Sequence, residues 1–472
     1  MSSYYDKNDP HTIASEKKLR RKMDMHIMPI LLFAELFGRY EQSVVTNAKL
    51  GGLLEDLNMS EFQYRWCLSA YYVAFFVVNI PINILFRRGR PSIFLTILIF
   101  TWGTLVLCMT ATTNFAGLLV CRIILGASEA VYDPIQMYYI SLWYTRHELA
   151  RRSGFTAIVS ALGGATIGLI AFGISQIPTN TLNTWQWLFI IFGAPSILLA
   201  IATLFFLPDK PETAKFFTEE ERKLELDRLK ADQGAAEDST WSWIQVKSVL
   251  TDWKTYAYGI ISGLSTIPGA GVRLALPSII DGLGTWAEDI SQALTTPPNI
   301  VACFFIFLTA YYSDRLFQRA YFLIAANVVA IIGFLMIMFI PEQHVGVRYF
   351  TVCILIAATR VDGPIRLAWY TSNHYGLTRR AVASGIIFCI DAIGSAVGGQ
   401  IYFDPPLYWK GHAIGLATVA LQSIAILTLR FTLKRINSNR AKMTPEEKER
   451  QIEKYGGHEL VGDRHPDFRY GL

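Results

Sequence analysis

The sequence predicts an all-α membrane protein with twelve transmembrane helices, arranged as two six-helix bundles around a central cavity. Of its 472 residues, 52% are hydrophobic and only 17% are charged, well below the roughly 25% that is usual in soluble domains. The apolar residues gather in long runs of the length that crosses a bilayer. Ionisable residues inside these runs concentrate on every third run, which indicates a shared polar interior.

A helix needs about 20 mostly apolar residues to cross a bilayer, and the chain offers twelve such runs. In order, the expected spans are 27–48, 64–86, 91–111, 115–143, 154–176, 185–207, 254–279, 296–312, 321–340, 348–372, 381–402 and 412–433. We therefore expect the lipid bilayer to be the protein's main solvent.

A polar stretch between the sixth and seventh spans divides the chain into halves. Residues 218–230 are typical of a solvated helix that begins with a capping box at Thr218 and Glu221. A second box, at Thr444 and Glu447, begins a helix in the tail. The expected domains are a cytoplasmic N-terminal segment 1–26, a first bundle 27–207, a cytoplasmic connector 208–250, a second bundle 251–433 and a cytoplasmic tail 434–472.

The Lys and Arg residues of the short loops predict the orientation. They gather on one side, which holds the N-terminal segment, the FRRGR loop with Arg87 and Arg88, the connector and the tail. Both termini are therefore expected in the cytoplasm, and the plasma membrane is the expected location. Asn58 begins an Asn-Met-Ser sequon on the outer side and is a candidate glycan acceptor, although Ser60 fits a helix cap equally well.

Ionisable side chains inside the spans are costly, about 2.5–3.5 kcal/mol each at a helix centre. The first span has Glu35, Arg39 and Glu41, the fourth Arg122, Glu129 and Asp133, the seventh Arg273, the tenth Arg360, Asp362 and Arg366, and the eleventh Asp391. They are either structural pairs between helices or the lining of a watery pathway. Their concentration on equivalent helices favours the pathway.

Helix geometry predicts how the charges of the first and fourth spans are arranged. Glu35 and Arg39 form an i,i+4 pair in the favourable order. Glu41 lies about 200° around the helix from Arg39, so the two must face different neighbours unless the helix is distorted. In the fourth span, the three charged residues fall within about 40° of one another on a single stripe.

The tenth span contains a proline among its charges. Pro364 removes a backbone hydrogen bond and permits a break in the helix. A break would let Arg360, Asp362 and Arg366 converge in spite of their spacing.

Several stretches show a family resemblance, and they occur in order over residues 17–435. They are TNAKLGGLLEDLNMS, NFAGLLVCRIILGASEAVYDP, PPNIVACFFIFLTAYYSDR, LAWYTSNHYGLTRRAVASG and IYFDPPLYWKGHA. The chain resembles the major facilitator superfamily and, within it, the fungal allantoate permease family of anion:cation symporters. The resemblance implies a carrier of small organic anions, such as ureido acids and vitamin carboxylates, usually moved together with protons.

The resemblance also carries over to particular residues. Arg122, Gly126, Glu129 and Pro134 match the motif of the fourth span, and Asn373, Gly376, Arg379 and Arg380 match the loop before the eleventh. Asp314 and Arg315 match the motif that locks helices on the inner face. Together with Arg87 and Arg88, they are our gating candidates.

The sequence departs from the family pattern at several charged positions. Tyr40, Glu41 and Gln42 replace a Leu-Asp-Arg-type run, so the acid is kept and the arginine is lost. Asn79 stands where an acid often precedes the proline of the second span. Asp391 replaces a neutral amide. Arg360 and Arg366 are additional charges that would suit a bulkier or more acidic anion.

We expect a secondary transporter that works by proton-coupled symport and alternating access. The substrate-binding candidates are Arg39, Glu41, Arg122, Arg360 and Arg366, and the proton-coupling candidates are Glu41, Glu129 and Asp391. Protonation of an acid would release an arginine to bind an anionic substrate. We expect a monomer that binds the anion and protons, with no nucleic-acid partner.

Two alternative functions remain open, and a third is not expected. An exporter of an acidic metabolite would have the same fold and similar charges. A non-transporting nutrient sensor is a further alternative, although the tail shows no signalling module. A membrane enzyme is not expected, because HELVG at 458–462 lacks the second His of a zinc-protease motif and the chain has no phosphate loop. The six cysteines show no metal-type spacing, so we expect neither metal nor cofactor.

Overall fold

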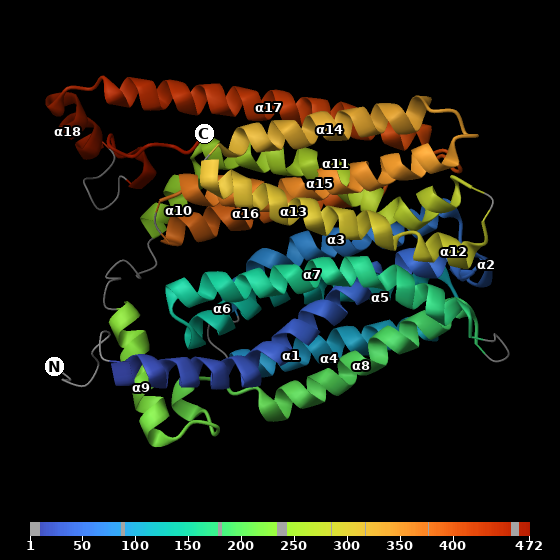
Figure 1. Ribbon diagram of the computed structural model, residues 1–472, viewed down its shortest axis with the longest axis horizontal. Helices are drawn as coiled ribbons and strands as arrows, with labels where there is room; N and C mark the ends of the chain where they lie inside the picture. Colours follow the sequence, from blue (N-terminus) through green and yellow to red (C-terminus); the bar gives the residue numbers. More distant parts are fainter. Residues whose placement is uncertain are drawn as a thin grey trace. The chain divides into compact units, whose positions relative to one another are not determined.

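The protein is helical wherever its computed structural model describes regular structure, with α-helices and two short 3-10 helices (Figure 1). The described residues are 10–85, 90–177, 182–233, 243–284, 286–316, 318–375, 377–454 and 462–472. Within them, contacts divide the chain into two compact units. The first unit comprises residues 1–60 and 77–237, and the second comprises residues 61–76 and 238–472.

The first unit is built from the long helices of the N-terminal half. Its helices are α1 (Pro10–Leu50), α2 (Leu53–Asp56), α4 (Pro91–Thr110), α5 (Phe115–Glu129), α6 (Tyr132–Trp143), α7 (Arg146–Ser175), α8 (Thr184–Phe206) and α9 (Glu219–Gln233), together with the end of α3 (Glu61–Leu85). α4 packs along α8, and α1 packs against α7 and α8.

The second unit begins with the first part of α3 and continues after the connector. Its helices are α10 (Trp243–Leu250), α11 (Trp253–Asp281), α12 (Glu288–Ala293), α13 (Thr296–Leu316), α14 (Arg319–Phe339), α15 (Val345–Asn373), α16 (Leu377–Gly398), α17 (Trp409–Ala441) and α18 (Pro445–Lys454). α11 packs against α16 and α17, and α15 packs against α13 and α14.

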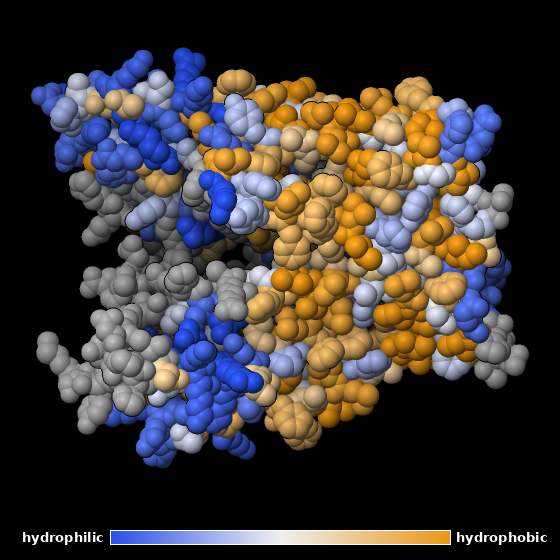
Figure 2. Space-filling view, viewed as in Figure 1, coloured by the Kyte–Doolittle hydropathy of each residue, from blue (hydrophilic) through white to orange (hydrophobic). Residues whose placement is uncertain are grey.

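Each of the twelve predicted spans falls on helices in the described part of the chain, with the fourth divided between α5 and α6, which confirms the fold class. Nine segments within the described ranges are long and apolar enough to cross a membrane. They are Pro91–Thr110, Phe115–Trp143, Gly154–Ser175, Thr184–Phe206, Trp253–Asp281, Asp289–Ser313, Arg319–Phe339, Arg379–Gly398 and Trp409–Ala441. The other predicted spans lie in α1, α3 and α15. On the face shown in Figure 2, hydrophobic side chains cover the middle of the helices and hydrophilic side chains gather at their ends.

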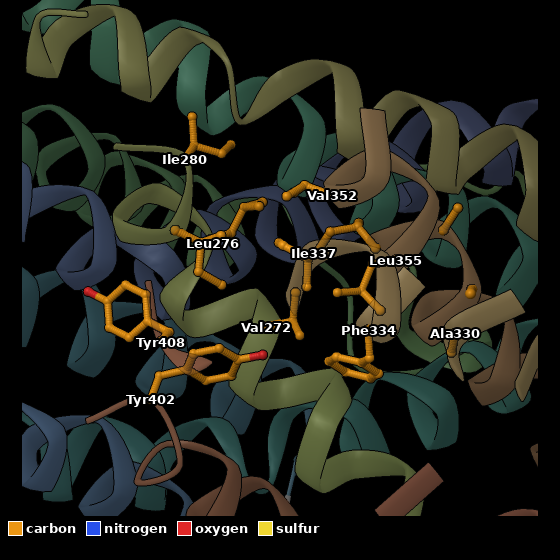
Figure 3. Close-up of a cluster of buried hydrophobic side chains, with 14 of the residues drawn as sticks. Val272, Leu276, Ile280, Ala330, Phe334, Ile337, Val352, Leu355, Tyr402 and Tyr408 are labelled. Carbon is orange, nitrogen blue, oxygen red and sulfur yellow. The ribbon is translucent and has the colours of Figure 1, made fainter. Parts of the chain in front are cut away.

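Each end of the second unit has its own buried apolar cluster. Figure 3 shows one cluster, in which Val272 and Leu276 of α11 approach Phe334 of α14 and Leu355 of α15. The other surrounds Trp369 and includes Tyr470 near the chain end. These clusters fix the faces of α11 and α15, and therefore the direction in which their polar residues point.

Glycines allow two helix pairs to approach closely. A Cβ at Gly103 of α4 would lie 2.8 Å from the Ser196 Cβ of α8. A Cβ at Gly394 of α16 would lie 2.2 Å from the Thr266 Oγ1 of α11 and 2.6 Å from the Gly263 carbonyl oxygen. Only glycine fits at these contacts, which bring polar residues of neighbouring helices within reach of one another.

Both predicted capping boxes are confirmed. The Thr218 amide donates to Glu221, and the Glu221 amide donates to the Thr218 hydroxyl. Thr444 and Glu447 make the same reciprocal pair at the start of α18.

The fourth predicted span, 115–143, is confirmed as an apolar span, Phe115–Trp143. It is interrupted rather than regular, because α5 ends at Glu129 and α6 begins at Tyr132. Conversely, α15 runs without a break through Pro364. Its neighbours can support a proline within a membrane helix, so Pro364 does not bring the charges of the tenth span together.

Candidate functional site: buried charges of the two units

The first unit contains a short chain of charges between α1 and α6. Arg39 Nε donates to Glu35 Oε1 over 2.9 Å, which confirms the predicted i,i+4 pair. Arg39 Nη2 lies 3.6 Å from Asp133 Oδ2. Gln136 and Tyr132 of α6 both donate to the Leu31 carbonyl, which holds α6 against α1 at this point. Glu35 is buried and Asp133 is exposed, so the chain of charges reaches the surface of the unit.

Glu41 faces a different helix from Arg39, as the helix geometry predicts. Its side chain is fully buried, and its Oε1 accepts a hydrogen bond of 2.5 Å from the Ser196 hydroxyl of α8. The close approach at Gly103 brings α4 onto the same part of α8. Glu129 of α5 lies within electrostatic range of the Glu41 carboxyl.

Arg122 and Glu129 share α5, but the predicted stripe with Asp133 is interrupted. Arg122 is fully buried, whereas Asp133 is exposed and lies beyond the break in the helix. The amide of Asn79 donates to the Ala130 carbonyl at the break over 3.3 Å. The Asn79 side chain therefore supplies a hydrogen-bond donor to the buried Ala130 carbonyl at the break in the helix.

The second unit holds a denser cluster around Asp362 of α15. Its Oδ2 accepts a 2.5 Å hydrogen bond from Ser265 of α11, and its Oδ1 accepts a 2.8 Å bond from Gln422 of α17. Arg366 Nε lies 3.4 Å from the same carboxylate. Donors from three helices therefore fix Asp362 in place.

Arg366 joins this cluster to Asp391 of α16. Its Nη1 donates to the Ser262 carbonyl over 2.7 Å and to Asp391 Oδ1 over 3.3 Å. The Asp391 side chain is 18% exposed, whereas that of Asp362 is 3% exposed. The two carboxylates beside Arg366 therefore differ: Asp362 is buried and held by the neutral donors of Ser265 and Gln422, whereas Asp391 is partly exposed.

Arg360 does not join this cluster, because the break at Pro364 that would have allowed it is not formed. Arg360 Nη2 instead donates to Asn299 Oδ1 of α13 over 3.3 Å, because the unbroken helix turns it away from Arg366.

The sequence analysis assigned no role at the site to Arg273 of α11. Its Nη2 donates to the Tyr72 hydroxyl of α3 over 2.7 Å, and among the described residues Arg273 forms no ion pair with a carboxylate.

The gating and glycosylation candidates are placed only in part. Arg87 and Arg88 lie outside the described residues, as does the side chain of Asp314. Arg315 is exposed, with its guanidinium 4.7 Å from the Tyr311 ring centroid. Asn58 is exposed with a φ of 49°, a conformation that asparagine tolerates well.

Within the described part of the chain, no group of three or more metal-ligating side chains comes together. All six cysteines are free, and Cys108 is exposed.

The sequence located the charges but missed their neutral partners. Ser196, Ser265, Gln422, Asn299 and Tyr72 each make a hydrogen bond to one of the charged groups. The available signal was a polar residue within an apolar run. That signal is weak, because a lone serine or threonine in a helix also satisfies itself on its own backbone.

Long apolar helices with ion pairs and charged hydrogen bonds inside them define a multi-pass membrane protein with a polar interior. The model of the family described as "Major Facilitator Superfamily" matches residues 31–399. The chain belongs to the major facilitator superfamily, and it is a membrane transporter.

Its relatives include fungal transporters of similar length. The MFS-type transporter cnsO of Penicillium expansum is 31% identical over 97% of this chain and 91% of its own length. The major facilitator-type transporter hxnP of Emericella nidulans is 28% identical over 97% of this chain and 94% of its own.

Solved structures of the same fold include a bacterial homologue of the human lysosomal transporter Spinster in an inward-facing, unoccupied conformation. It has a TM-score of 0.67 and 15% identity and covers 90% of this chain and 98% of its own. A D-xylose–proton symporter has a TM-score of 0.65 and 14% identity over 84% of this chain and 96% of its own.

Proposed function

We propose that this chain carries a small organic anion of the carboxylate, vitamin or ureido-acid type across the membrane together with a proton, by alternating access. The observation that carries the proposal is the placement of Arg366 between a locked carboxylate, Asp362, and an accessible one, Asp391. An arginine of this kind binds a substrate carboxylate only when one of its own acids gives way.

Asp391 is the acid that gives way in this mechanism. A proton on Asp391 removes its negative charge and weakens its contact with Arg366, while Ser265 and Gln422 keep Asp362 in place. The released guanidinium face then pairs with the carboxylate of the substrate. Proton and anion therefore bind together and leave together, which is the requirement for symport.

Arg273 supplies a second positive charge in the same unit. Because its described partner is the neutral Tyr72 hydroxyl, its charge is available to attract an anion. An anion with two acidic groups would suit a unit that offers both Arg273 and Arg366.

In the first unit, we assign proton coupling to Glu41 and Glu129 and substrate contact to Arg39, Glu41 and Arg122. Glu41 supports this assignment, because it is fully buried and no described donor lies within hydrogen-bond distance of its Oε2. A buried carboxyl with one donor is suited to hold a proton. Arg360, paired with an amide, completes the substrate-binding set.

The proposal includes the assignments that follow from the sequence alone. They are the allantoate permease family, the domain limits, gating by Asp314, Arg315, Arg87 and Arg88, a monomer without enzymatic activity, a glycan on Asn58, and a plasma-membrane location with both termini in the cytoplasm. The basic loops support the orientation.

The test is uptake and efflux of labelled carboxylates and ureido acids in cells that express the chain, at external pH 5.5 and 7.5. We expect uptake of at least one anion to be faster at the lower pH. Faster efflux than uptake would indicate the exporter instead, and pH-independent uptake would contradict proton coupling.

Two variants then test the site. Arg366→Ala should abolish uptake at unchanged membrane abundance, and Asp391→Asn should lose accumulation while it keeps exchange of anion for anion. Arg450→Ala, an exposed arginine of α18, is the matched control. Uptake by Arg366→Ala with an unchanged KM would overturn the assignment.

A further inference from the structure

The chain end is built into the second unit. Asp463, in the short helix Gly462–Arg464, is buried and lies between two cations. It pairs with Lys254 at the start of α11, and its Oδ1 accepts a 2.9 Å bond from Arg379 Nη1 of α16. Arg440 of α17 donates to the Asp463 backbone carbonyl over 3.1 Å. One residue of the tail thus connects three helices.

Tyr470 makes the second contact. Its hydroxyl accepts a 2.7 Å bond from Lys254 Nζ and donates to the Asp463 carbonyl over 2.9 Å. Its backbone pairs with the Asn437 side chain of α17 in both directions, each over 2.9 Å. Tyr470 is buried, so these bonds are shielded from water.

Gly471 makes the third contact, with α15. Its amide donates to Asn373 Oδ1 over 2.7 Å, and its carbonyl accepts from Asn373 Nδ2 over 3.0 Å and from Trp369 Nε1 over 2.9 Å. Side chains that bond both the N–H and the C=O groups of a bound segment's backbone are typical of a peptide-binding pocket. Tyr470, Phe468 and Leu472 add apolar contact to the cluster around Trp369.

The pocket lies on the two helices that carry the central ion pair of the second unit. Arg366 and Trp369 are neighbours on one face of α15, about one turn apart, and Asn373 follows one turn later. Arg379 and Asp391 share α16. A shift of α15 or α16 against α11 and α17 would therefore disturb both the tail contacts and the Arg366–Asp391 pair.

We propose that residues 463–472 form a releasable latch: the ends of α11, α15, α16 and α17 make a peptide-binding pocket, and the docked chain end slows the helix movements that transport requires. The occupant is the segment 463–472 of this chain itself. Its recognition depends on the Asp463 carboxylate, the Tyr470 hydroxyl and the Gly471 backbone.

Charge governs how firmly the latch is held. Burial on its own would raise the pKa of Asp463, but Lys254 and Arg379 lower it, and the resulting pKa lies below the ordinary value. The carboxylate is therefore ionised at neutral pH, and the latch is docked by a charged contact rather than by apolar burial alone.

The first test measures binding and does not require a known substrate. The chain is cut after Lys454, reconstituted in nanodiscs and titrated with a labelled peptide of residues 462–472. We expect saturable binding to the shortened chain and none to the full-length chain, whose pocket is occupied. Asp463→Asn in the peptide should weaken binding at least tenfold. Asp467→Asn should not, because Asp467 is exposed and pairs with Lys448 of α18.

The second test measures whether the docked segment restricts the motion of the helices and slows transport. Added peptide should slow hydrogen exchange in residues 369–385 of the shortened chain, and removal of the latch should raise the rate of anion exchange without changing KM. If the shortened chain does not fold, full-length chain with Tyr470→Phe takes its place, and we expect the free peptide to compete for its pocket.

The outcomes separate the latch from the proposed transport function, on which only the rate measurement rests. Peptide binding equal for the two Asp→Asn peptides, or absent, overturns the latch. If the peptide binds and slows hydrogen exchange, but removal of the segment leaves the rate of anion exchange unchanged, then the latch does not slow transport. Failure to find any transported anion counts against the proposed function and leaves the binding and protection results to decide the latch.

Discussion

The Ser196 hydroxyl of α8 donates to Glu41 Oε1 of α1 over 2.5 Å, and both side chains are fully buried. Ser196→Ala would remove this donor and leave the carboxyl with less compensation for its burial, so we expect a loss of about 1–3 kcal/mol of stability. Thermal unfolding of the purified variant and of the unchanged protein in detergent measures this loss of stability.

The matched control is Ser141→Ala. Ser141 is exposed and donates to the Tyr138 carbonyl of its own helix, so its loss should hardly change unfolding. Equal midpoints for the two variants would show that the contact between Ser196 and Glu41 does not stabilise the fold.

Gly394 of α16 tests the close packing of α16 on α11. Gly394→Ala would place a Cβ 2.6 Å from the Gly263 carbonyl oxygen, so the backbones must separate. Overpacking of this kind costs about 1–3 kcal/mol or more, and we expect a clear loss of folded protein in size-exclusion chromatography. Gly385→Ala, in the same helix, meets nothing within 4 Å and should elute as the unchanged chain does. A normal elution profile for Gly394→Ala would contradict the packing.

Glu225 of α9 should make stability depend on pH. Burial raises its pKa to about 7, although Arg228 opposes the shift. The folded state therefore holds a proton between pH 4.5 and about 7 that the unfolded state has lost, so stability falls as pH rises through this window, by on the order of 3 kcal/mol at most.

Glu225→Gln should flatten that dependence, because glutamine cannot ionise and can still accept from Arg228. The measurement is the unfolding midpoint from pH 4.5 to 8. Glu220→Gln, an exposed position in the same helix, should keep the slope of the unchanged chain. A slope in Glu225→Gln as steep as in that control would refute the assignment.

The sequence predicts those features that depend on residues close to one another in the chain. The capping boxes, the pair of Glu35 with Arg39 and nine of the predicted spans all depend on residues close in the chain, and they are confirmed within the described residues. Helical phase also places Glu41 and Arg39 on different faces. Phase fixes the direction of a side chain from its own helix but not which neighbour it meets, so Ser196 could not be found this way.

Helix continuity and the docked chain end were beyond such reasoning for the same reason. Whether Pro364 breaks a helix depends on neighbours that satisfy the backbone, and α15 continues through it. Tyr470 and Gly471 have no periodic pattern, and their partners are Lys254, Asn373 and Asn437, all distant in sequence.

Asp362 and Asp391 flank Arg366, yet their amide variants should behave in opposite ways. Asn in place of Asp362 can accept through only one of its two side-chain atoms. With Gln422 still paired to the oxygen, the donors of Ser265 and Arg366 would face an NH2 group. Each buried donor left without an acceptor costs about 1–3 kcal/mol, so Asp362→Asn should unfold at a clearly lower temperature.

Asp391→Asn should leave the unfolding midpoint nearly unchanged, because the asparagine oxygen can still accept from Arg366 and the side chain is partly accessible to water. The comparison uses purified protein at one pH, so it is independent of transport. A loss of stability at Asp391 as large as that at Asp362 would mean that both acids are structural. Arg366 would then have no described partner that can yield to an anion, because the two carboxylates that the structure describes beside it would both be fixed parts of the helix packing.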